Sequence, residues 1–189
     1  MPRRRRIRTG LKKLVKSMIN NNTETKTGIQ TFASTTVTSA GTNYPIPELA
    51  AGVKQNERVG NQIRMTSLRI KGIFNQTGSH VYDVVRCVVY IPKDPDDLLN
   101  VDTTMAIDQD KFTVLSDRLV PLSAAADPVK LFNKVLLFNK GKRNGMRVQF
   151  SSDLATSCTK NNIKMYLVSM HPVNQPTFSG YWRFYFKDA

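Results

Sequence analysis

The side chains that most often carry catalysis or bind metals are few in this sequence and lie far apart. The two histidines are His80, which follows a Gly-Ser pair, and His171, which precedes a proline; neither has a cysteine or a carboxylate at a zinc-ligand spacing. The motifs GxSxG, GxxxxGK[ST] and GxGxxG are all missing. We therefore predict that the protein is not an enzyme and that it holds no metal or other cofactor.

Carboxylates cluster in one segment, residues 93–110, which contains six of the 14 acidic residues. An exposed polar loop and a calcium site are the two interpretations. The acids do not follow the D-x-[DN]-x-[DN]-G-x5-E pattern of the helix-loop-helix calcium site, which favours the polar loop. The two cysteines stand in unlike surroundings, Cys87 in the apolar run VVRCVVY and Cys158 in a polar stretch. This predicts reduced thiols in an intracellular protein rather than a disulfide framework.

Basic side chains alternate with apolar ones in two segments that we expect to be strands. In residues 180–187, one face carries Trp182, Phe184 and Phe186, and in residues 62–75 one face carries Leu68, Ile70 and Phe74. If the two strands are neighbours, their opposite faces form one basic patch with aromatic rings that can stack on nucleobases. The residues of this predicted patch are Arg69, Lys71, Arg183, Lys187, Tyr181 and Tyr185. The alternative is that both faces are ordinary solvated strand faces.

The N-terminal segment concentrates positive charge. Its eight basic residues are Arg3, Arg4, Arg5, Arg6, Arg8, Lys12, Lys13 and Lys16, and the first acid is Glu24. Residues 1–16 therefore carry a charge of +8. The whole chain has a formal net charge of +14, so the other 173 residues carry only +6. Such asymmetry is typical of an arm that meets a polyanion: nucleic acid, an anionic membrane or an acidic protein. A solvated tail or a nuclear-import signal is the simpler interpretation, and we favour nucleic-acid contact, which an import role can share.

Residues 10–20 predict a short amphipathic helix after this arginine run, with Thr9 as a cap. One face of the helix consists of Leu11, Leu14, Val15, Met18 and Ile19. A helix of about three turns is marginal alone in water, so its apolar stripe needs a partner: the folded domain, further copies of itself or a membrane. Lysines break the apolar run that a secretory signal requires. The sequence also contains no run of about 18 apolar residues, so we predict no membrane span.

The rest of the chain divides into a polar segment and a β-rich body. We assign residues 1–22 to the arm, 23–60 to a polar linker with irregular structure, in which GIQTFASTTVTSAG can add an edge strand, and 61–189 to the folded domain. Strands are predicted at 62–75, 81–91, 111–119, 129–138, 145–151, 162–170 and 180–187. Ile63 and Met65 are out of phase with Leu68, which predicts a β-bulge near residues 66–67. Asn144-Gly145 predicts a hairpin between two of the strands.

The order of these segments resembles a known family. It runs from the basic arm through RVGNQIRMTSLRIKGIF, VRCVVYIPKD, KFTVLSDRLVPL and LLFNKGKRNGMRVQFSS to YWRFYFKD. In this order the chain resembles the capsid proteins of small circular, Rep-encoding single-stranded DNA viruses, the circovirus-like group. More distantly it resembles the coat proteins of satellite plant RNA viruses, whose amphipathic arm helix it shares. The arm is short for the circovirus-like group.

The resemblance implies an all-β, eight-stranded antiparallel jelly roll in which the first and last strands are neighbours. It implies self-assembly of about sixty copies into a T=1 icosahedral shell with the arm inside, where the apolar helix faces of several copies meet. The expected partner is the packaged single-stranded genome, which the resemblance implies is DNA, bound without sequence specificity because nothing in the arm resembles base-edge readout. The protein is then a virion protein that visits the host nucleus through the import machinery. A cell receptor would contact the loops 93–110, 120–128 or 139–144.

Two other classes of protein share these features. One is a cellular single-stranded nucleic-acid-binding β-barrel, which has the same basic, aromatic face and stays monomeric or forms a small oligomer. The other is a membrane-active basic peptide fused to a jelly-roll lectin or cytokine-like domain. Assembly state separates the first from a capsid protein, and binding to anionic vesicles separates the second.

Overall fold

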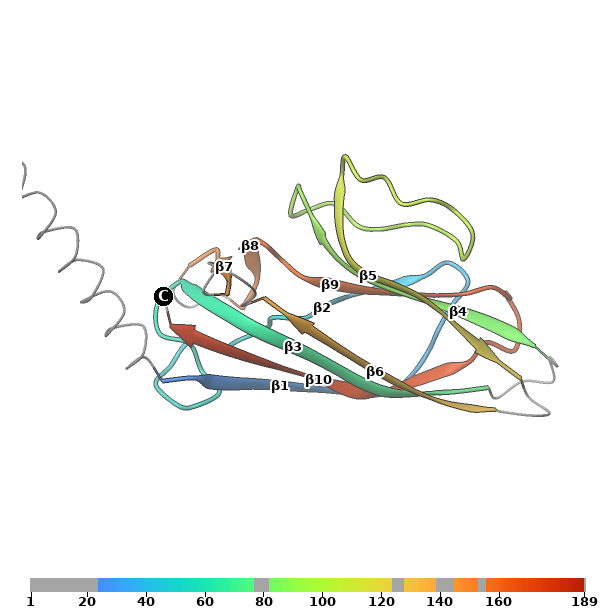
Figure 1. Ribbon diagram of the computed structural model, residues 1–189, viewed down its shortest axis with the longest axis horizontal. Helices are drawn as coiled ribbons and strands as arrows, with labels where there is room; N and C mark the ends of the chain where they lie inside the picture. Colours follow the sequence, from blue (N-terminus) through green and yellow to red (C-terminus); the bar gives the residue numbers. More distant parts are fainter. Residues whose placement is uncertain (1–23, 77–81, 124–127, 139–144, 153–155, 189) are drawn as a thin grey trace, which may run out of the picture.

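The structure is a computed structural model that describes residues 24–76, 82–123, 128–138, 145–152 and 156–188. These residues form ten strands and no helix (Figure 1). The strands are β1 (Lys26–Thr36), β2 (Thr42–Pro45), β3 (Gln62–Asn75), β4 (Asp83–Pro92), β5 (Phe112–Leu122), β6 (Val129–Leu137), β7 (Met146–Phe150), β8 (Cys158–Lys160), β9 (Lys164–Ser169) and β10 (Thr177–Asp188). All their pairings are antiparallel.

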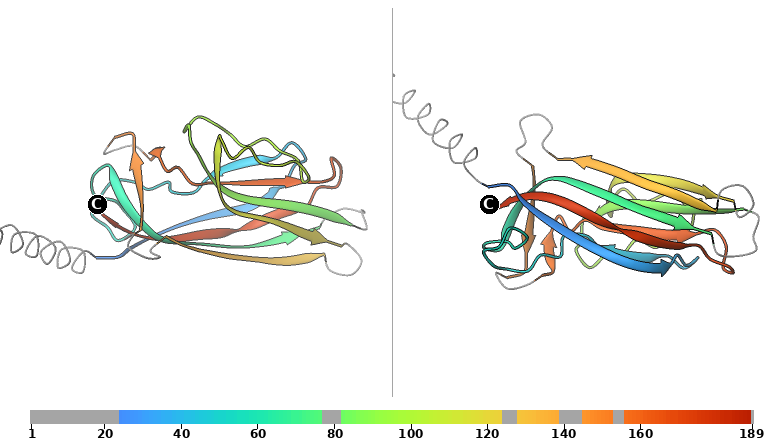
Figure 2. Two further views of the ribbon diagram at one scale, coloured as in Figure 1. Left: turned by 45° about the horizontal axis from the view of Figure 1, so that its top comes forward. Right: turned by 90° about the horizontal axis from the view of Figure 1, so that it is seen from below.

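Two sheets pack face to face, as Figures 1 and 2 show. In the six-stranded sheet β10 lies between β1 and β3, and the other edge of β3 pairs with β6 and β7. In the four-stranded sheet the order is β2-β9-β4-β5. Without the short pair β7-β8, the strand orders β1-β10-β3-β6 and β2-β9-β4-β5 are those of an eight-stranded jelly roll. The predicted fold class is confirmed for the described residues; the predicted arm helix lies outside them.

The polar range 23–60 is more ordered than a linker. It contributes β1, which pairs with β10 along the sheet edge, and β2, which pairs with β9. The jelly roll therefore begins at Lys26, which corrects the expectation that residues 23–60 are a linker with at most an edge strand. Hydrophobic alternation fails in β1 because its buried positions include Lys26 and Gly28, and an added Cβ at Gly28 would overlap the ring of Phe184.

The seven predicted strands all occur, within a few residues of the expected bounds. The predicted bulge is also present: Tyr185 pairs with Ser67 and Phe186 pairs with Met65, so Thr66 is the extra residue of β3. This bulge brings Ile63 and Met65 onto the buried face that Leu68 begins, and all three are fully buried. The Thr66 hydroxyl donates to the carbonyl oxygen of Tyr185 at 3.1 Å.

The predicted hairpin between residues 129–138 and 145–151 is wrong. Both β6 and β7 pair antiparallel with β3, at Ser67–Asn75 and at Gln62–Met65 respectively. The two strands therefore run in the same direction, one after the other along one edge of β3. Asn144-Gly145 is a local signal, and the long β3 overrides it because it offers both strands a partner. Gly145 does adopt a positive φ of 97°, and residue 144 lies outside the described residues.

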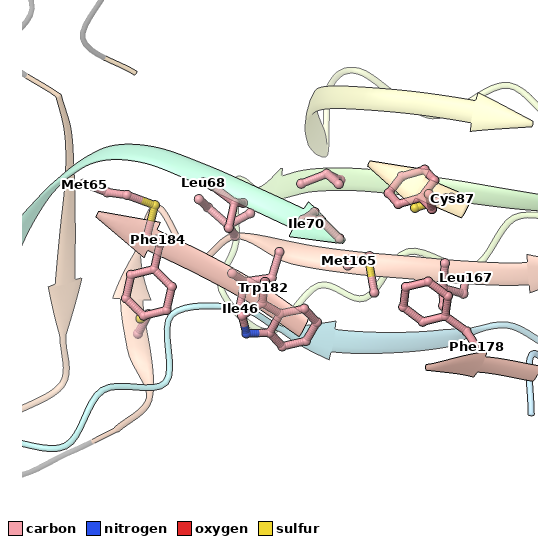
Figure 3. Packing of buried hydrophobic residues seen from close by; sticks show 14 of the residues in the cluster. Ile46, Met65, Leu68, Ile70, Cys87, Met165, Leu167, Phe178, Trp182 and Phe184 are labelled. Carbon is pink, nitrogen blue, oxygen red and sulfur yellow. The ribbon is translucent and has the colours of Figure 1, made fainter. Parts of the chain in front are cut away.

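Aromatic side chains fill the space between the sheets (Figure 3). Trp182, Phe184 and Phe186 are buried, as their alternation predicts. The ring centroid of Phe32 lies 4.6 Å from that of Trp182 and 5.1 Å from that of Phe178. The indole N–H of Trp182 donates to the Gln30 side chain at 2.9 Å, which satisfies the one polar group of this cluster.

Both cysteines are buried free thiols. Burial raises the pKa of Cys87 and that of Cys158 to about 12 each. At pH 8 the reactive thiolate then makes up on the order of one in ten thousand of each group. We expect both thiols of the native protein to resist Ellman's reagent at pH 8 and to react fully in denaturant, as followed by absorbance at 412 nm. Rapid reaction of either thiol in the native protein would contradict this burial.

Candidate nucleic-acid interface

The predicted patch depends on β3 and β10 being neighbours, and they are. Arg183 lies opposite Arg69 and Tyr181 lies opposite Lys71 in the register of the two strands. Each basic residue follows a buried apolar residue of its strand, so alternation turns the basic side chain away from the core. The structure therefore brings Arg69, Lys71, Tyr181, Arg183, Tyr185 and Lys187 onto the outward surface of the six-stranded sheet.

Two further arginines extend the patch beyond what the sequence predicted. Arg64 pairs with Lys187 on one side and with Arg147 of β7 on the other. Simple alternation assigns residues 64 and 69 to opposite faces of β3, and the bulge at Thr66 restores them to the same face. The predicted bulge could therefore have placed Arg64 on the patch. Arg147 joins the patch only through the pairing of β7 with β3, which the sequence did not predict.

We call this surface the basic face. It comprises the outward side chains of the six-stranded sheet, with Arg64, Arg69, Lys71, Arg147, Arg183 and Lys187 as its cations and Tyr181 and Tyr185 as its aromatic residues.

The strands provide no acid to neutralise the basic face. Among the described strand residues, no outward position of the six-stranded sheet is Asp or Glu. The one acid at the end of β10, Asp188, pairs with Lys26 at 2.8 Å and accepts a hydrogen bond from the backbone N–H of Val59. Cations gathered on one surface attract a polyanion and raise its local concentration.

Within the basic face, Arg183 is a candidate for contact with an anion. Its guanidinium lies 5.9 Å from the ring centroid of Tyr181, within range of a cation–π contact. Its Nε is buried and has no hydrogen-bond partner in the structure. Phosphate oxygens are strong acceptors for a guanidinium, so Arg183, on the outward side of β10, is a candidate contact for a backbone phosphate.

The acidic segment 93–110 covers the opposite side of the molecule. It packs Leu99, Val101 and Ile107 on Val88, Tyr90 and Tyr166 of the four-stranded sheet. Polar bonds also fix the segment: Tyr166 donates to the carbonyl of Val101 at 2.8 Å, and Lys164 donates to the carbonyls of Pro95 and Asp97. The segment that contains six acids therefore lies on one side of the sandwich, and the sheet that carries the basic face lies on the other (Figure 1).

Arg86 holds the same segment to β5 and β4. It makes a two-pronged ion pair with Asp117, at 3.0 and 2.7 Å, and donates to the carbonyls of Asp102 and Met105. The hydrogen bond to Asp117 raises the pKa of Arg86, so it stays charged. The segment that is a candidate for receptor contact is thus an ordered cover.

The carboxylates of the segment bond to their own backbone rather than converging. Asp102 accepts from the backbone N–H groups of Thr104 and Met105, both at 2.7 Å, and these bonds lower its pKa. Asp94 and Asp108 each accept from the backbone N–H two residues on. In the part of the chain that the structure describes, no three metal-binding side chains gather.

The N-terminal arm lies outside the described residues, with its eight cations and the apolar residues Leu11, Leu14, Val15, Met18 and Ile19. Its attachment point is defined, because Lys26 begins β1 opposite Phe186, near the end of β10. β1 therefore begins at an edge of the six-stranded sheet, next to the row that holds Lys187 (Figure 2). No helix among the described residues is long and apolar enough to cross a membrane.

Comparisons with known proteins give similarities of structure alone. No family model matches the chain, and no curated protein matches its sequence. Among solved structures, Desmodium yellow mottle tymovirus is similar over 86% of this chain and 86% of that chain, with 10% identity and a TM-score of 0.39. The infectious bursal disease virus VP2 subviral particle is similar over 86% of this chain and 33% of that chain, with 16% identity and a TM-score of 0.36. The Gx strain of infectious bursal disease virus gives 13% identity, 86% and 32% coverage, and a TM-score of 0.37.

Proposed function

We propose that this chain is the coat protein of a small icosahedral virus and that it binds the packaged single-stranded nucleic acid through its arm and its basic face. One observation carries the proposal. A jelly-roll sandwich carries six outward cations on one sheet, next to the start of the strand that follows the eight basic residues of the arm, and the six acids of segment 93–110 lie over the other sheet.

Electrostatics accounts for the proposed cargo binding. A packaged genome needs many phosphate contacts and little sequence discrimination, and Lys and Arg contacts to phosphate supply both. With about sixty copies, the arms alone bring roughly 480 positive charges into one shell. The tyrosines of the basic face add sequence-tolerant stacking on unpaired bases.

The finer identity follows the sequence resemblance. We propose a circovirus-like protein that forms a T=1 shell around circular single-stranded DNA, with the basic face and the arm turned inward. The apolar residues of neighbouring arms then pack together at a symmetry axis. The arginine run serves nuclear import before assembly, and the outward acidic segment 93–110 is available to a cell receptor.

The test is size-exclusion chromatography of nuclease-treated full-length protein with absorbance followed at 260 and 280 nm. We expect a particle of megadalton size with excess absorbance at 260 nm, because the shell protects its cargo. A particle without nucleic acid would contradict the packaging role. A monomer that stays free of nucleic acid at low salt would overturn the whole proposal.

The basic face also supports a second candidate, a cellular single-stranded nucleic-acid-binding protein. The face is complete within a single chain, so it does not require a shell. A monomer or small oligomer that elutes with bound single-stranded nucleic acid would favour this candidate.

A further inference from the structure

A groove of about 410 Å³ opens on the basic face where β10, β3 and β6 lie side by side. Three consecutive rows of residues form the groove, each row made of residues that lie opposite one another on the three strands. The first row is Tyr181, Lys71 and Asn133, and the third is Ser179, Ile73 and Leu131. The middle row contains Gly180 opposite Gly72, followed by the buried Phe132, so it places no side chain on the outward surface.

The spacing of these rows suits a flat ring. Outward side chains of alternate rows are about 7 Å apart along a strand. A planar group with van der Waals contacts of about 3.5 Å on each side fills that separation. One end of the groove presents the phenol ring of Tyr181, and the other presents the aliphatic side chains of Ile73 and Leu131, of which Leu131 is 81% exposed.

Charge indicates what fills the groove. Lys71 forms part of its wall, and Arg69 and Arg183 pair with each other in the next outward row of the same two strands. A second copy that presented its own basic face here would be repelled by these like charges. An occupant that combines a flat apolar ring with an attached anion satisfies both the groove and its cations.

We propose that the groove binds the base of one unpaired nucleotide, with Tyr181 stacked on the base and Lys71 on the adjoining phosphate. This inference rests on the proposed function and names the part of the nucleic acid that the basic face recognises. The side-chain amide of Asn133, in the same row as Tyr181 and Lys71, offers both a donor and an acceptor to the edge of the base.

Single-strand selection follows from this geometry. A base within a duplex has both faces covered by its neighbours, and its hydrogen-bonding edge is occupied by its partner. To enter the groove it would have to leave the stack, at a cost of a few kcal/mol. An unpaired base enters without that cost, so the groove discriminates by strand state, whereas the arm responds only to phosphate charge.

The test compares three ligands with the full-length chain by fluorescence anisotropy: a labelled short deoxyadenosine oligomer, an abasic strand of equal length, and a duplex. For Tyr181→Ala we expect binding of the deoxyadenosine oligomer to weaken by about 5- to 150-fold, the range measured for loss of one stacked base. Binding of the abasic strand should stay unchanged. Tyr181→Phe should keep the affinity, and Tyr82→Ala serves as the control because Tyr82 is an exposed tyrosine next to the other sheet.

Other outcomes overturn the inference. An equal loss on the oligomer and the abasic strand would make Tyr181 a structural residue. A loss of assembly with unchanged oligomer affinity would make the groove a contact between copies. If the wild-type chain binds abasic and base-bearing strands equally and steeply with salt, the groove proposal fails and the packaging function stands. If it binds neither strand, the packaging function fails as well.

Discussion

A chain that begins at residue 23 is expected to bind single-stranded DNA with less than half the salt dependence of the full chain. The full chain offers eight cations in the arm and six on the basic face. At about −0.7 per phosphate contact, the slope of log affinity against log salt is about −10 for the full chain and about −4 for the shortened one. Between 50 and 200 mM salt, the full chain then loses about a million-fold in affinity and the shortened chain about 300-fold.

Titrating a labelled single strand at several salt concentrations measures both slopes. Adding Arg69→Gln and Arg183→Gln to the shortened chain should reduce its slope further, to about −3. The matched control is Lys93→Gln with Lys111→Gln, two exposed lysines at the two ends of the acidic segment, which should leave the slope unchanged. Equal slopes for the full and shortened chains would mean that the arm does not contact the nucleic acid. A control that lowers the slope as much as the arginine pair would show that the basic face has no special role.

The second large effect concerns stability. We expect Gly180→Val to destabilise the folded chain by about 4 kcal/mol or more. A Cβ added at Gly180 would clash with the backbone oxygen of Lys71 and would lie 2.7 Å from the Cα of Gly72. Because both obstacles are backbone atoms of β3, the strain can be relieved only by separating two central strands of the six-stranded sheet.

Urea unfolding followed by tryptophan fluorescence reports this change, because the one tryptophan, Trp182, lies two residues away in the core. The control is Gly60→Ala. Gly60 has a φ of +78° and open space around it, so its substitution should cost only about 1–2 kcal/mol of backbone strain. If Gly180→Val does not fold at all, Gly180→Ala gives the measurement, with a smaller loss that still exceeds the control. A loss at Gly180 no larger than that at Gly60 would show that the two strands separate easily.

The sequence predicted most of the body because its strands bury alternate side chains. In β10 the alternation predicts that Trp182, Phe184 and Phe186 face the core. It predicts that Tyr181, Arg183 and Tyr185 face outward, and the structure confirms both predictions. We expected β3 and β10 to be adjacent in one sheet because we took residues 62–75 as the first strand. They are the third strand, and β10 still adjoins them because it lies between the first strand and the third.

The missed features depend on contacts between segments that are distant in the sequence. β1 is recognisable as a full strand only once Phe184 covers Gly28 and Lys26 meets Asp188. β2 is a four-residue edge strand that ends in Pro45, too short for a pattern. Arg147 joined the basic face only because β7 pairs with β3, which a local hairpin signal at Asn144-Gly145 argued against. The groove needed three strands in register, and no single segment encodes it.

The six cations of the basic face and the six acids of segment 93–110 lie on opposite sides of the sandwich, and together they contribute an electric dipole directed across its thickness. In the field near a polyanion, a dipole experiences a torque as well as an attraction. Under the proposed function, we expect each copy to turn its six-stranded sheet toward the nucleic acid within about a Debye length, roughly 8 Å at physiological salt, before any contact forms. Orientation would then precede binding, and raising the ionic strength would reduce the fraction of productive encounters as well as the affinity.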